Sequence, residues 1–363
     1  MNLTSKSIHK TTNISVMKEM LEMGHEQIVY CSDKKTGLKA IIAIHDTTLG
    51  PALGGTRMWD YRHENEAIED VLRLSRGMSL KASISGLNLG GGKAVIIGNS
   101  KKDKTPELMK SFGRFVDSLG GKYITAEDVG MTTKDMEYVR SATKYVTGIP
   151  EKMGGSGNPS PFTAFGVYMG MKASARYKWG TDILEGKKIV VQGIGHVGES
   201  LVGHLKKEGA SVFVNDIDLN RVKYICNKYS VTSIDQDSIY DFDMDIYSPC
   251  ALGSVLNPHT ISRLKCSIIA GAANNQLSDE TRDGKLLLEK KILYAPDFLI
   301  NAGGLINVYS ELNGYDKQKS TNKTKEIYNT TLDIFEKAEL SGTTTHEAAL
   351  EIAKNRISDS KKL

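Results

Sequence analysis

The sequence predicts an α/β protein with two domains and a cleft between them. The chain has 363 residues, which is long for one core at the usual scale of roughly 100 to 200 residues per domain. Apolar β-branched runs alternate with helix-like runs along most of it, as in α/β folds. The densest cluster of Gly, Pro and Ser lies between Thr147 and Pro161. Such clusters mark linkers, so we expect one domain at 1–150, completed by a C-terminal helix at 335–363, and a second at 151–334.

Periodicity places the elements of the first domain in order. Leucines at helical spacing and apolar β-branched runs distinguish its helices from its strands. The predicted elements are a strand over Gly37 to His45, a helix over Glu64 to Met78, a strand over Ala94 to Gly98, a helix over Pro106 to Leu119 and a strand over Lys122 to Ala126. The last strand leads into Glu127 and Asp128, which puts Asp128 at a strand end.

Lys93 ends the run Gly-Leu-Asn-Leu-Gly-Gly-Gly-Lys that begins at Gly86. This run places a cation in an apolar, glycine-rich wall, where loss of water disfavours the ammonium form and lowers a lysine pKa. Lys93 is therefore a candidate general base. Lys81 upstream and Asp128 downstream complete a set of two lysines and one carboxylate, which suits an anionic substrate and proton transfer beside it.

Two other interpretations of this run are a nucleotide phosphate loop and a tight turn. A nucleotide phosphate loop requires Gly where Leu87 stands and Ser or Thr where Ala94 stands, so the sequence argues against one. A tight turn with a solvent-exposed lysine is the other interpretation of Lys93 taken alone, because most lysines are exposed.

The second domain begins with a helical pattern from Thr163 to Tyr177, whose start is expected to face the cleft. A strand over Lys187 to Gln192 then leads into Gly193-Ile194-Gly195-His196-Val197-Gly198, a helix to about Gly209 and a strand over Ser211 to Val214. A G-x-G-x-x-G motif is weak evidence alone. Here it has the strand before it, the helix after it and an acidic residue, Asp216, about 20 positions further on, as a Rossmann-type dinucleotide-binding domain requires.

Each glycine of the motif has its own physical role. Gly193 permits the tight turn, Gly195 lets the backbone approach a pyrophosphate and Gly198 permits close packing of helix on strand. His196 and Val197 open the helix, whose N-terminus receives the phosphate charge. Asp216 is suited to the ribose hydroxyls and would repel the extra phosphate of NADP, so NAD is the predicted cofactor.

Three alternatives stay open for this domain. Arg221 near Asp216 leaves room for NADP, and a βαβ unit without a ligand has the same pattern. The segments Ser248 to Ala251, with Cys250, and Gly271 to Asn275, with Asn274, would line the same carboxyl edge of the sheet, or be plain loops.

Composition excludes several classes of function. The chain is 40% hydrophobic and 25% charged, with 47 basic and 43 acidic residues and a net charge of +4. This is an ordinary globular composition without a basic face for nucleic acid. No signal peptide and no run of about 20 apolar residues is present, so no membrane role is expected. Four scattered cysteines without metal-ligand spacing favour reduced thiols, no metal site and a cytoplasmic location.

Five stretches together resemble the amino acid dehydrogenase family that includes glutamate, leucine, phenylalanine and valine dehydrogenases, and the leucine-type members most closely. The resemblance runs through nearly the whole chain. The stretches are Asp46 to Arg57, Gly86 to Lys93, Ala126 to Gly130, Gly154 to Pro161 and Asn301 to Val308.

The resemblance implies reversible oxidative deamination, in which an L-amino acid, NAD and water give a 2-oxo acid, ammonium and NADH. It assigns Lys93 as the base that activates water, and Asp128 as the group that handles protons on the departing amine. The resemblance further implies that Lys81, Asn301 and the backbone of Gly54 and Gly55 bind the substrate carboxylate. It also implies that Thr163 holds the nicotinamide carboxamide and that Asn274 contacts the cofactor.

Substrate specificity is carried over in the same way. Leu53 and Val308 stand where glutamate enzymes present a lysine and a hydroxyl residue, Ala126 is small as in the leucine type, and Leu305 adds a wall. This implies an apolar pocket for leucine, valine and isoleucine, although Leu53 and Val308 alone could be plain core. Like-charge repulsion predicts that Lys81 stays protonated while Lys93 titrates lower.

The sequence leaves three rival functions open, and it departs from the family pattern in several places. A phenylalanine or other large-side-chain dehydrogenase, a silent NAD-binding regulator and a 2-hydroxy acid dehydrogenase are the alternatives; the last usually needs a histidine, and none occupies the catalytic segments. The departures are Ser83-Ile84-Ser85, Phe162, a longer N-terminus and an early C-terminus at Leu363. The resemblance implies a homo-oligomer, an octamer in the family, and the altered termini weaken the octamer inference.

Overall fold

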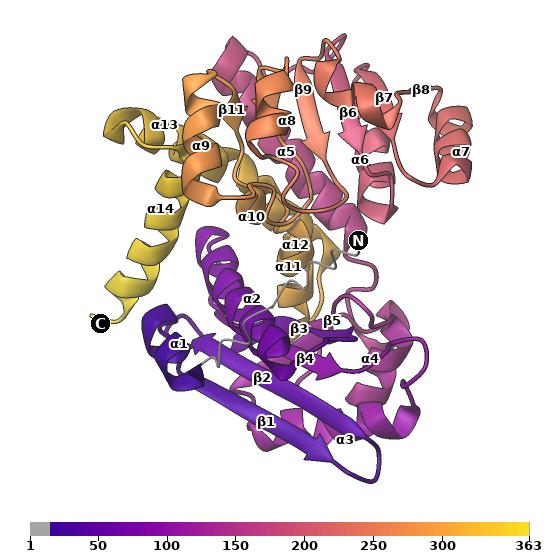
Figure 1. The fold of residues 1–363 in the computed structure, drawn as a ribbon, viewed down its shortest axis with the longest axis vertical. Coiled ribbons are helices and arrows are strands. Elements are labelled where there is room, and N and C mark those ends of the chain that lie inside the picture. Colours follow the sequence, from indigo (N-terminus) through magenta and orange to yellow (C-terminus); the bar gives the residue numbers. More distant parts are fainter. Residues whose placement is uncertain (1–14, 363) are drawn as a thin grey trace, which may run out of the picture.

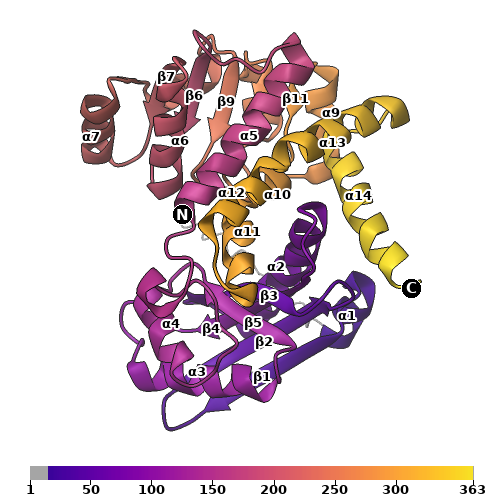
Figure 2. The ribbon, with the colours of Figure 1, turned by 180° about the vertical axis from the view of Figure 1, so that it is seen from behind.

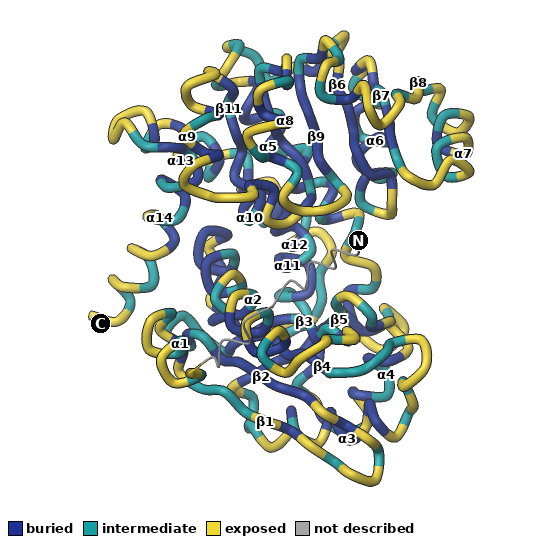
Figure 3. The backbone as a smooth tube through the Cα atoms, viewed as in Figure 1, coloured by how far each residue is buried: buried dark blue, intermediate teal, exposed yellow. Residues whose placement is uncertain are grey.

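The computed structural model describes residues 15–362 and confirms the α/β fold with two domains (Figure 1). Each domain is built on its own sheet. Buried backbone follows the two sheets and the helices between them, while the outer helices and loops are exposed (Figure 3). The strand ends that carry the candidate site residues therefore lie between two sheets. No helix among the described residues is long and apolar enough to cross a membrane.

The first domain has a mixed five-stranded sheet in the order β1-β2-β4-β3-β5. Strands β3, β4 and β5 are parallel, whereas β1 and β2 run antiparallel to their neighbours. Its elements are α1 (Val16–Met23), β1 (Gln27–Asp33), β2 (Leu38–Asp46), β3 (Ala52–Trp59), α2 (Glu64–Ile84), β4 (Gly90–Ile97), α3 (Pro106–Ser118), β5 (Tyr123–Glu127) and α4 (Thr133–Arg140).

The predicted start of the fourth strand was wrong, because β4 begins in the glycine run at Gly90 and not at Ala94. Glycine is disfavoured in strands, but close packing requires it here. A Cβ on Gly91 would lie 2.1 Å from the Ser79 amide nitrogen of α2, and one on Gly92 would lie 2.7 Å from the Tyr123 ring. Lys93 therefore belongs to a central strand, not to a turn.

Helix α2 is also longer than predicted and continues past Met78 to Ile84, so that it carries Lys81. The strand β3, which holds Leu53, Gly54 and Gly55, was not predicted at all. Its glycines and Arg57 interrupt the alternation of apolar residues that predicts a strand. Hydrogen-bonded pairing with β4 and β5 stabilises the strand where its own β-propensity is low.

The second domain has a parallel six-stranded sheet in the order β11-β10-β9-β6-β7-β8, which is the strand order of the Rossmann fold. The order reverses between β6 and β9, where the carboxyl ends of the strands open a crevice. Its strands are β6 (Lys188–Gln192), β7 (Ser211–Asn215), β8 (Thr232–Ser233), β9 (Ile246–Pro249), β10 (Ile268–Ile269) and β11 (Leu293–Tyr294).

Helices cover both faces of this sheet, and α5 crosses its back (Figure 2). The α-helices are α5 (Ser160–Trp179), α6 (His196–Lys207), α7 (Leu219–Tyr229), α8 (Pro258–Arg263), α9 (Glu280–Glu289), α10 (Asp297–Ile300), α11 (Gly303–Tyr309), α12 (Lys317–Lys325), α13 (Ile327–Ser341) and α14 (Thr345–Ser360). Short 3-10 helices are η1 (Glu151–Met153), η2 (Gln236–Asp241) and η3 (Ser310–Asn313).

The C-terminal segment is two helices and not one helix over 335–363. Gly342 takes a left-handed conformation that ends α13, and Thr344 with Glu347 forms a capping box that starts α14. Helix α14 then returns to the first domain (Figure 1). The Ser83 hydroxyl donates to the Ala353 carbonyl at 2.7 Å, and Arg356 donates to the Leu87 carbonyl at 2.7 Å. Ser83, a departure from the family pattern, thus anchors α14.

The Gly-, Pro- and Ser-rich linker is held by one carboxylate. Glu311 of η3 accepts hydrogen bonds from the amide of Gly148 at 2.9 Å, from the amide of Ser156 at 2.9 Å and from the Ser156 hydroxyl. Asn307 adds a hydrogen bond to the Ser156 carbonyl at 3.3 Å. The chain between the two sheets is therefore fixed at both sides of η1 by residues of the second domain.

Two histidines lie where α1, β1 and β2 meet α2, with His25 buried and His45 half-buried. The rings of His25 and His45 pack edge to face at 4.8 Å, and His25 Nε2 lies 2.9 Å from the Ser75 hydroxyl. Burial, with the neighbouring His45, lowers the pKa of His25 to about 4, and burial also lowers the pKa of His45. Among the described residues, no carboxylate forms a hydrogen bond with either ring.

This pair predicts a loss of stability in mild acid. The unfolded chain takes up a proton at His25 near pH 6.5, whereas the folded chain does so only near pH 4. The free energy of unfolding should therefore fall as the pH drops through this window, by about 3 kcal/mol in all. Urea unfolding at pH 7.5 and pH 5 measures the effect at fixed protein concentration. The His25→Gln variant should show a flatter dependence, and an unchanged slope would contradict the assignment.

Candidate active site

A cavity of about 420 Å³ lies between the two domains. The first domain contributes residues of β3, α2, β4 and the end of β5, and the second contributes residues of α5, α6, α10, α11 and the loop after β10. The sequence-predicted residues that line it together are Leu53, Gly55, Lys81, Lys93, Ala126, Asp128, Thr163, Val197, Asn274, Asn301, Leu305 and Val308. Gly54 does not line it; its carbonyl accepts a hydrogen bond from the Tyr123 hydroxyl at 2.7 Å.

Lys93 and Asp128 form an ion pair at one wall of the cavity. The Lys93 ammonium lies 2.8 Å from Asp128 Oδ2, and Lys93 is only 6% exposed. Arg57 Nε contacts the same oxygen at 3.2 Å. Burial works to raise the pKa of the Asp128 carboxyl, but Lys93 and Arg57 outweigh it and the pKa is lowered. Asp128 is therefore an ionised carboxylate held against the candidate base.

Lys81 reaches across the cleft to the second domain. Its ammonium donates to Asn274 Oδ1 at 3.1 Å, and the same oxygen accepts from Asn301 Nδ2 at 2.8 Å. The Asn301 side-chain oxygen is buried and has no hydrogen-bond partner among the described residues. Polar groups of three elements thus converge on one point, as binding of a charged ligand group requires.

Lys81 was expected to stay protonated, and it still holds its proton at pH 7. Burial, reinforced by the positive charge of Lys93, nevertheless lowers the pKa of Lys81 to about 8. Asp297 and Asp128 act in the opposite direction. The sequence did not predict this shift, because the predicted helix ended at Met78 and α2 continues through Lys81.

Another part of the cavity is apolar. Leu53, Ala126, Leu305 and Val308 are buried and line it. Sequence reasoning missed Met78, which lines it too, because the predicted helix ended at that residue. It also missed Arg57 as a site residue, although Arg57 stands at the end of a stretch that resembles the family.

The glycine turn after β6 has the shape that a dinucleotide needs. Gly193 has φ +93°, and a Cβ on Gly198 would lie 2.1 Å from the Gly193 carbonyl. A Cβ on Gly195 would meet no described atom within 4 Å, so this glycine faces open space at the N-terminus of α6, with His196 exposed as the first helical residue. Cys250 and Ala251 follow β9 next to this turn, and the Cys250 amide donates to the Gln192 carbonyl at 2.7 Å.

Asp216 follows β7 and faces the same turn, where its Oδ2 accepts a hydrogen bond from the Ile194 amide at 2.8 Å. Arg221, the residue that left NADP as an alternative cofactor, contacts other protein groups. Its Nε donates to the Ile194 carbonyl at 2.9 Å, and its Nη2 forms an ion pair with Glu199. The guanidinium is therefore tied to the Ile194 carbonyl and to Glu199 of α6.

The Thr163 hydroxyl donates to the Pro159 carbonyl at 3.2 Å at the start of α5. Phe162, the departure beside it, is buried and does not line the described cavity. Ser85 donates to the Lys81 carbonyl at 2.7 Å within the end of α2. Phe162 and Ser85 thus pack around the site without entering it.

A parallel sheet with a glycine turn at its switch point, beside a cleft with two lysines and a carboxylate, defines an oxidoreductase of the dinucleotide-binding class. Two family models match the chain: "Glu/Leu/Phe/Val dehydrogenase, dimerisation domain" over residues 25–145 and "Glutamate/Leucine/Phenylalanine/Valine dehydrogenase" over residues 213–363. The chain belongs to this family and is an amino acid dehydrogenase.

Full-length relatives carry different substrate names. The leucine dehydrogenase of Thermoactinomyces intermedius is 52% identical over 95% of this chain and 94% of its own. The phenylalanine dehydrogenase of Caldalkalibacillus thermarum is 47% identical over 92% and 91%. The crystal structure of L-tryptophan dehydrogenase from Nostoc punctiforme covers 96% of this chain and 100% of that one, with 47% identity and a TM-score of 0.85. Overall similarity thus leaves the substrate open.

Proposed function

We propose that this protein catalyses the reversible NAD-dependent oxidative deamination of the branched-chain L-amino acids leucine, valine and isoleucine. The observation that carries the proposal is the apolar part of the cavity. Leu53, Ala126, Leu305 and Val308 offer no charge or hydroxyl to a polar side chain. Discrimination among the three substrates should be shallow, since one methylene is worth only about 1 to 3 kcal/mol in such a pocket.

The residues present fit NAD. The open space at Gly195 and the N-terminus of α6 suit a pyrophosphate, and the negative Asp216 suits ribose hydroxyls. Engagement of Arg221 with Glu199 favours NAD over NADP. Thr163, Val197 and Asn274 line the cavity on the cofactor side. NAD, when bound, supplies the acceptor for the hydride that leaves the substrate Cα.

The side chains of the cavity then divide the remaining work. Lys81, with Asn301 and the Gly55 backbone, binds the substrate carboxylate. The carboxylate takes the place that Asn274 holds at the Lys81 ammonium. Asp128 takes a proton from the substrate ammonium, so that loss of the hydride leaves an iminium. Lys93 in its neutral form removes a proton from the water that attacks the iminium carbon, and Asp128 returns its proton to the nitrogen. The nitrogen leaves and takes up the hydroxyl proton as ammonium, and Lys93 then releases its proton to solvent. Exclusion of water by closing domains would strengthen these charges.

The match to a dimerisation domain over residues 25–145 supports a homo-oligomer. We propose that the assembly forms through the first domain, with small-molecule substrates as the other partners and a cytoplasmic location. Light scattering on the purified protein measures its size.

A substrate panel tests the proposed specificity. L-leucine, L-valine and L-isoleucine with NAD should each give NADH, followed by absorbance, and L-phenylalanine, L-tryptophan and L-glutamate should react far more slowly. The apolar part of the cavity, formed by Leu53, Ala126, Leu305 and Val308, offers no cation to the second carboxylate of glutamate. Preferred turnover of phenylalanine or tryptophan would keep the deamination chemistry and overturn the branched-chain assignment.

Replacing the proposed base tests the mechanism. Lys93→Ala should abolish turnover, because no other described side chain stands in its place beside Asp128. NAD binding, measured by calorimetry, should change little, since Lys93 lies on β4 and the glycine turn lies in the other domain. Turnover close to that of the unchanged protein would remove Lys93 from the role of base.

Asp216→Ala tests the cofactor assignment. The loss of the carboxylate should weaken NAD and narrow its advantage over NADP, because the repulsion of the 2′-phosphate is removed. Steady-state kinetics with both cofactors gives the ratio. If the ratio of the two kcat/KM values stays the same, Asp216 does not select the cofactor.

A further inference from the structure

Arg57 connects two carboxylates of the first domain. Its side chain is only 23% exposed, and its guanidinium lies where Asp128, after β5, comes close to Asp70 of α2. Nε donates to Asp128 Oδ2 at 3.2 Å, and Nη1 donates to Asp70 Oδ2 at 2.8 Å. The rigid planar fork of arginine can serve two acceptors in fixed directions, which a single ammonium cannot do.

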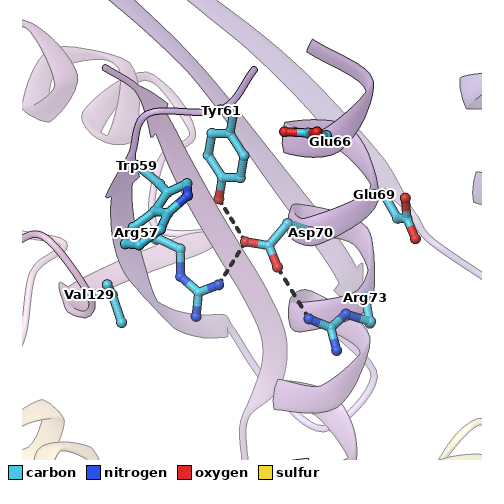
Figure 4. Close-up of a pocket in the computed structure, with 8 residues that line it drawn as sticks. All are labelled: Arg57, Trp59, Tyr61, Glu66, Glu69, Asp70, Arg73 and Val129. Carbon is cyan, nitrogen blue, oxygen red and sulfur yellow. Dashed lines mark hydrogen bonds and ion pairs between the residues drawn. The ribbon is translucent and has the colours of Figure 1, made fainter. Parts of the chain in front are cut away.

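Asp70 is itself held from two further sides. The Tyr61 hydroxyl donates to Asp70 Oδ2 at 2.7 Å, and Arg73 Nη2 lies 3.4 Å from Oδ1 (Figure 4). Burial and this hydrogen bond raise the pKa of Tyr61, so the hydroxyl remains a donor. A continuous chain of contacts thus runs from Tyr61 through Asp70 and Arg57 to Asp128, and ends at Lys93.

Arg57 also forms part of the wall between two spaces. It lines the catalytic cavity, and it lines an adjacent hollow of about 640 Å³ with Trp59, Tyr61 and Val129 (Figure 4). Trp59 is 54% exposed. The hollow therefore gives small solutes a route to the guanidinium.

We propose that Arg57 is a positioning residue for the catalytic carboxylate: anchored on Asp70, its guanidinium holds Asp128 at Lys93. Asp128 follows the end of a strand, and among the described residues its carboxylate is held by Lys93, by Arg57 and by the Val129 backbone. Lys93 and Arg57 both bind its Oδ2. When Lys93 changes its own contacts during turnover, Arg57 keeps the carboxylate in place. This inference rests on the proposed deamination.

The first test is removal and chemical rescue. Arg57→Ala should lower kcat on the order of 100-fold, as expected when a catalytic group is misplaced by about 1 Å, with NAD affinity unchanged. Guanidinium chloride, at concentrations that leave the wild-type melting temperature unchanged, should restore part of the lost kcat through the hollow. Urea is planar and neutral and should not, and neither should sodium chloride at equal ionic strength.

Four variants separate positioning from general damage. Arg57→Lys should recover activity only in part, because one ammonium cannot bridge both carboxylates. Asp70→Ala should lower kcat less than Arg57→Ala, and the double variant should be no worse than Arg57→Ala alone, since both changes break one chain. The matched control is Arg73→Ala, which also removes a cation from Asp70 and from the cavity wall but breaks none of the described contacts of Asp128. The acid limb of kcat/KM should move to higher pH in Arg57→Ala and not in Arg73→Ala.

Crystal structures give a readout that does not depend on turnover. In Arg57→Ala the Asp128 carboxylate should leave its place at Lys93, and soaked guanidinium should occupy the vacated space between Asp70 and Asp128. An unmoved Asp128, or a kcat loss that guanidinium does not relieve and that follows the melting temperature, would overturn the proposal. A wild-type protein inactive on every amino acid would overturn the proposed function instead, and the crystal structures would still decide the position of Asp128.

Discussion

The close packing of α2 on the glycine strand β4 is the constraint on which the site depends. Gly91 brings the strand so near to Ser79 that any side chain there would collide with the helix backbone. Two residues beyond this contact on each element stand Lys81 and Lys93. Because helix and strand touch without a side chain between them, the two lysines open into one cavity, and the charge of Lys93 is felt at Lys81. The glycine run is therefore a spacing device for two cations.

The same closeness explains what sequence could and could not predict. The turn at Gly193, the strand end at Asp128 and the burial of Lys93 follow from local rules, and the structure has them. The glycines of β4 defeat strand propensity because their reason is tertiary: a helix and the Tyr123 ring occupy the space a side chain would need. The strand β3 was missed for a similar reason, since its central position is set by its two parallel neighbours.

The distribution of charge was the part of the site that the sequence predicted least well. Sequence placed both lysines and Asp128 in one group, but did not predict that burial also lowers the pKa of Lys81. That depends on Lys81 facing the second domain, where Asn274 and Asn301 meet it. Arg57 was hidden for the same reason, because its partner Asp70 is defined only when α2 crosses β3. Contacts between distant elements, rather than residue types, carry this information.

Charge balance in the cavity bears on the kind of substrate it suits. Lys93 and Arg57 face Asp128, Arg57 also faces Asp70, and Asp297 favours the charged form of Lys81. Leaving a buried charge without a partner is costly, so a ligand that brings both signs disturbs this arrangement least. A zwitterionic amino acid offers a carboxylate to Lys81 and an ammonium to Asp128, whereas a 2-hydroxy acid offers only the carboxylate. The electrostatics thus favour an amino acid before any pocket for its side chain is considered.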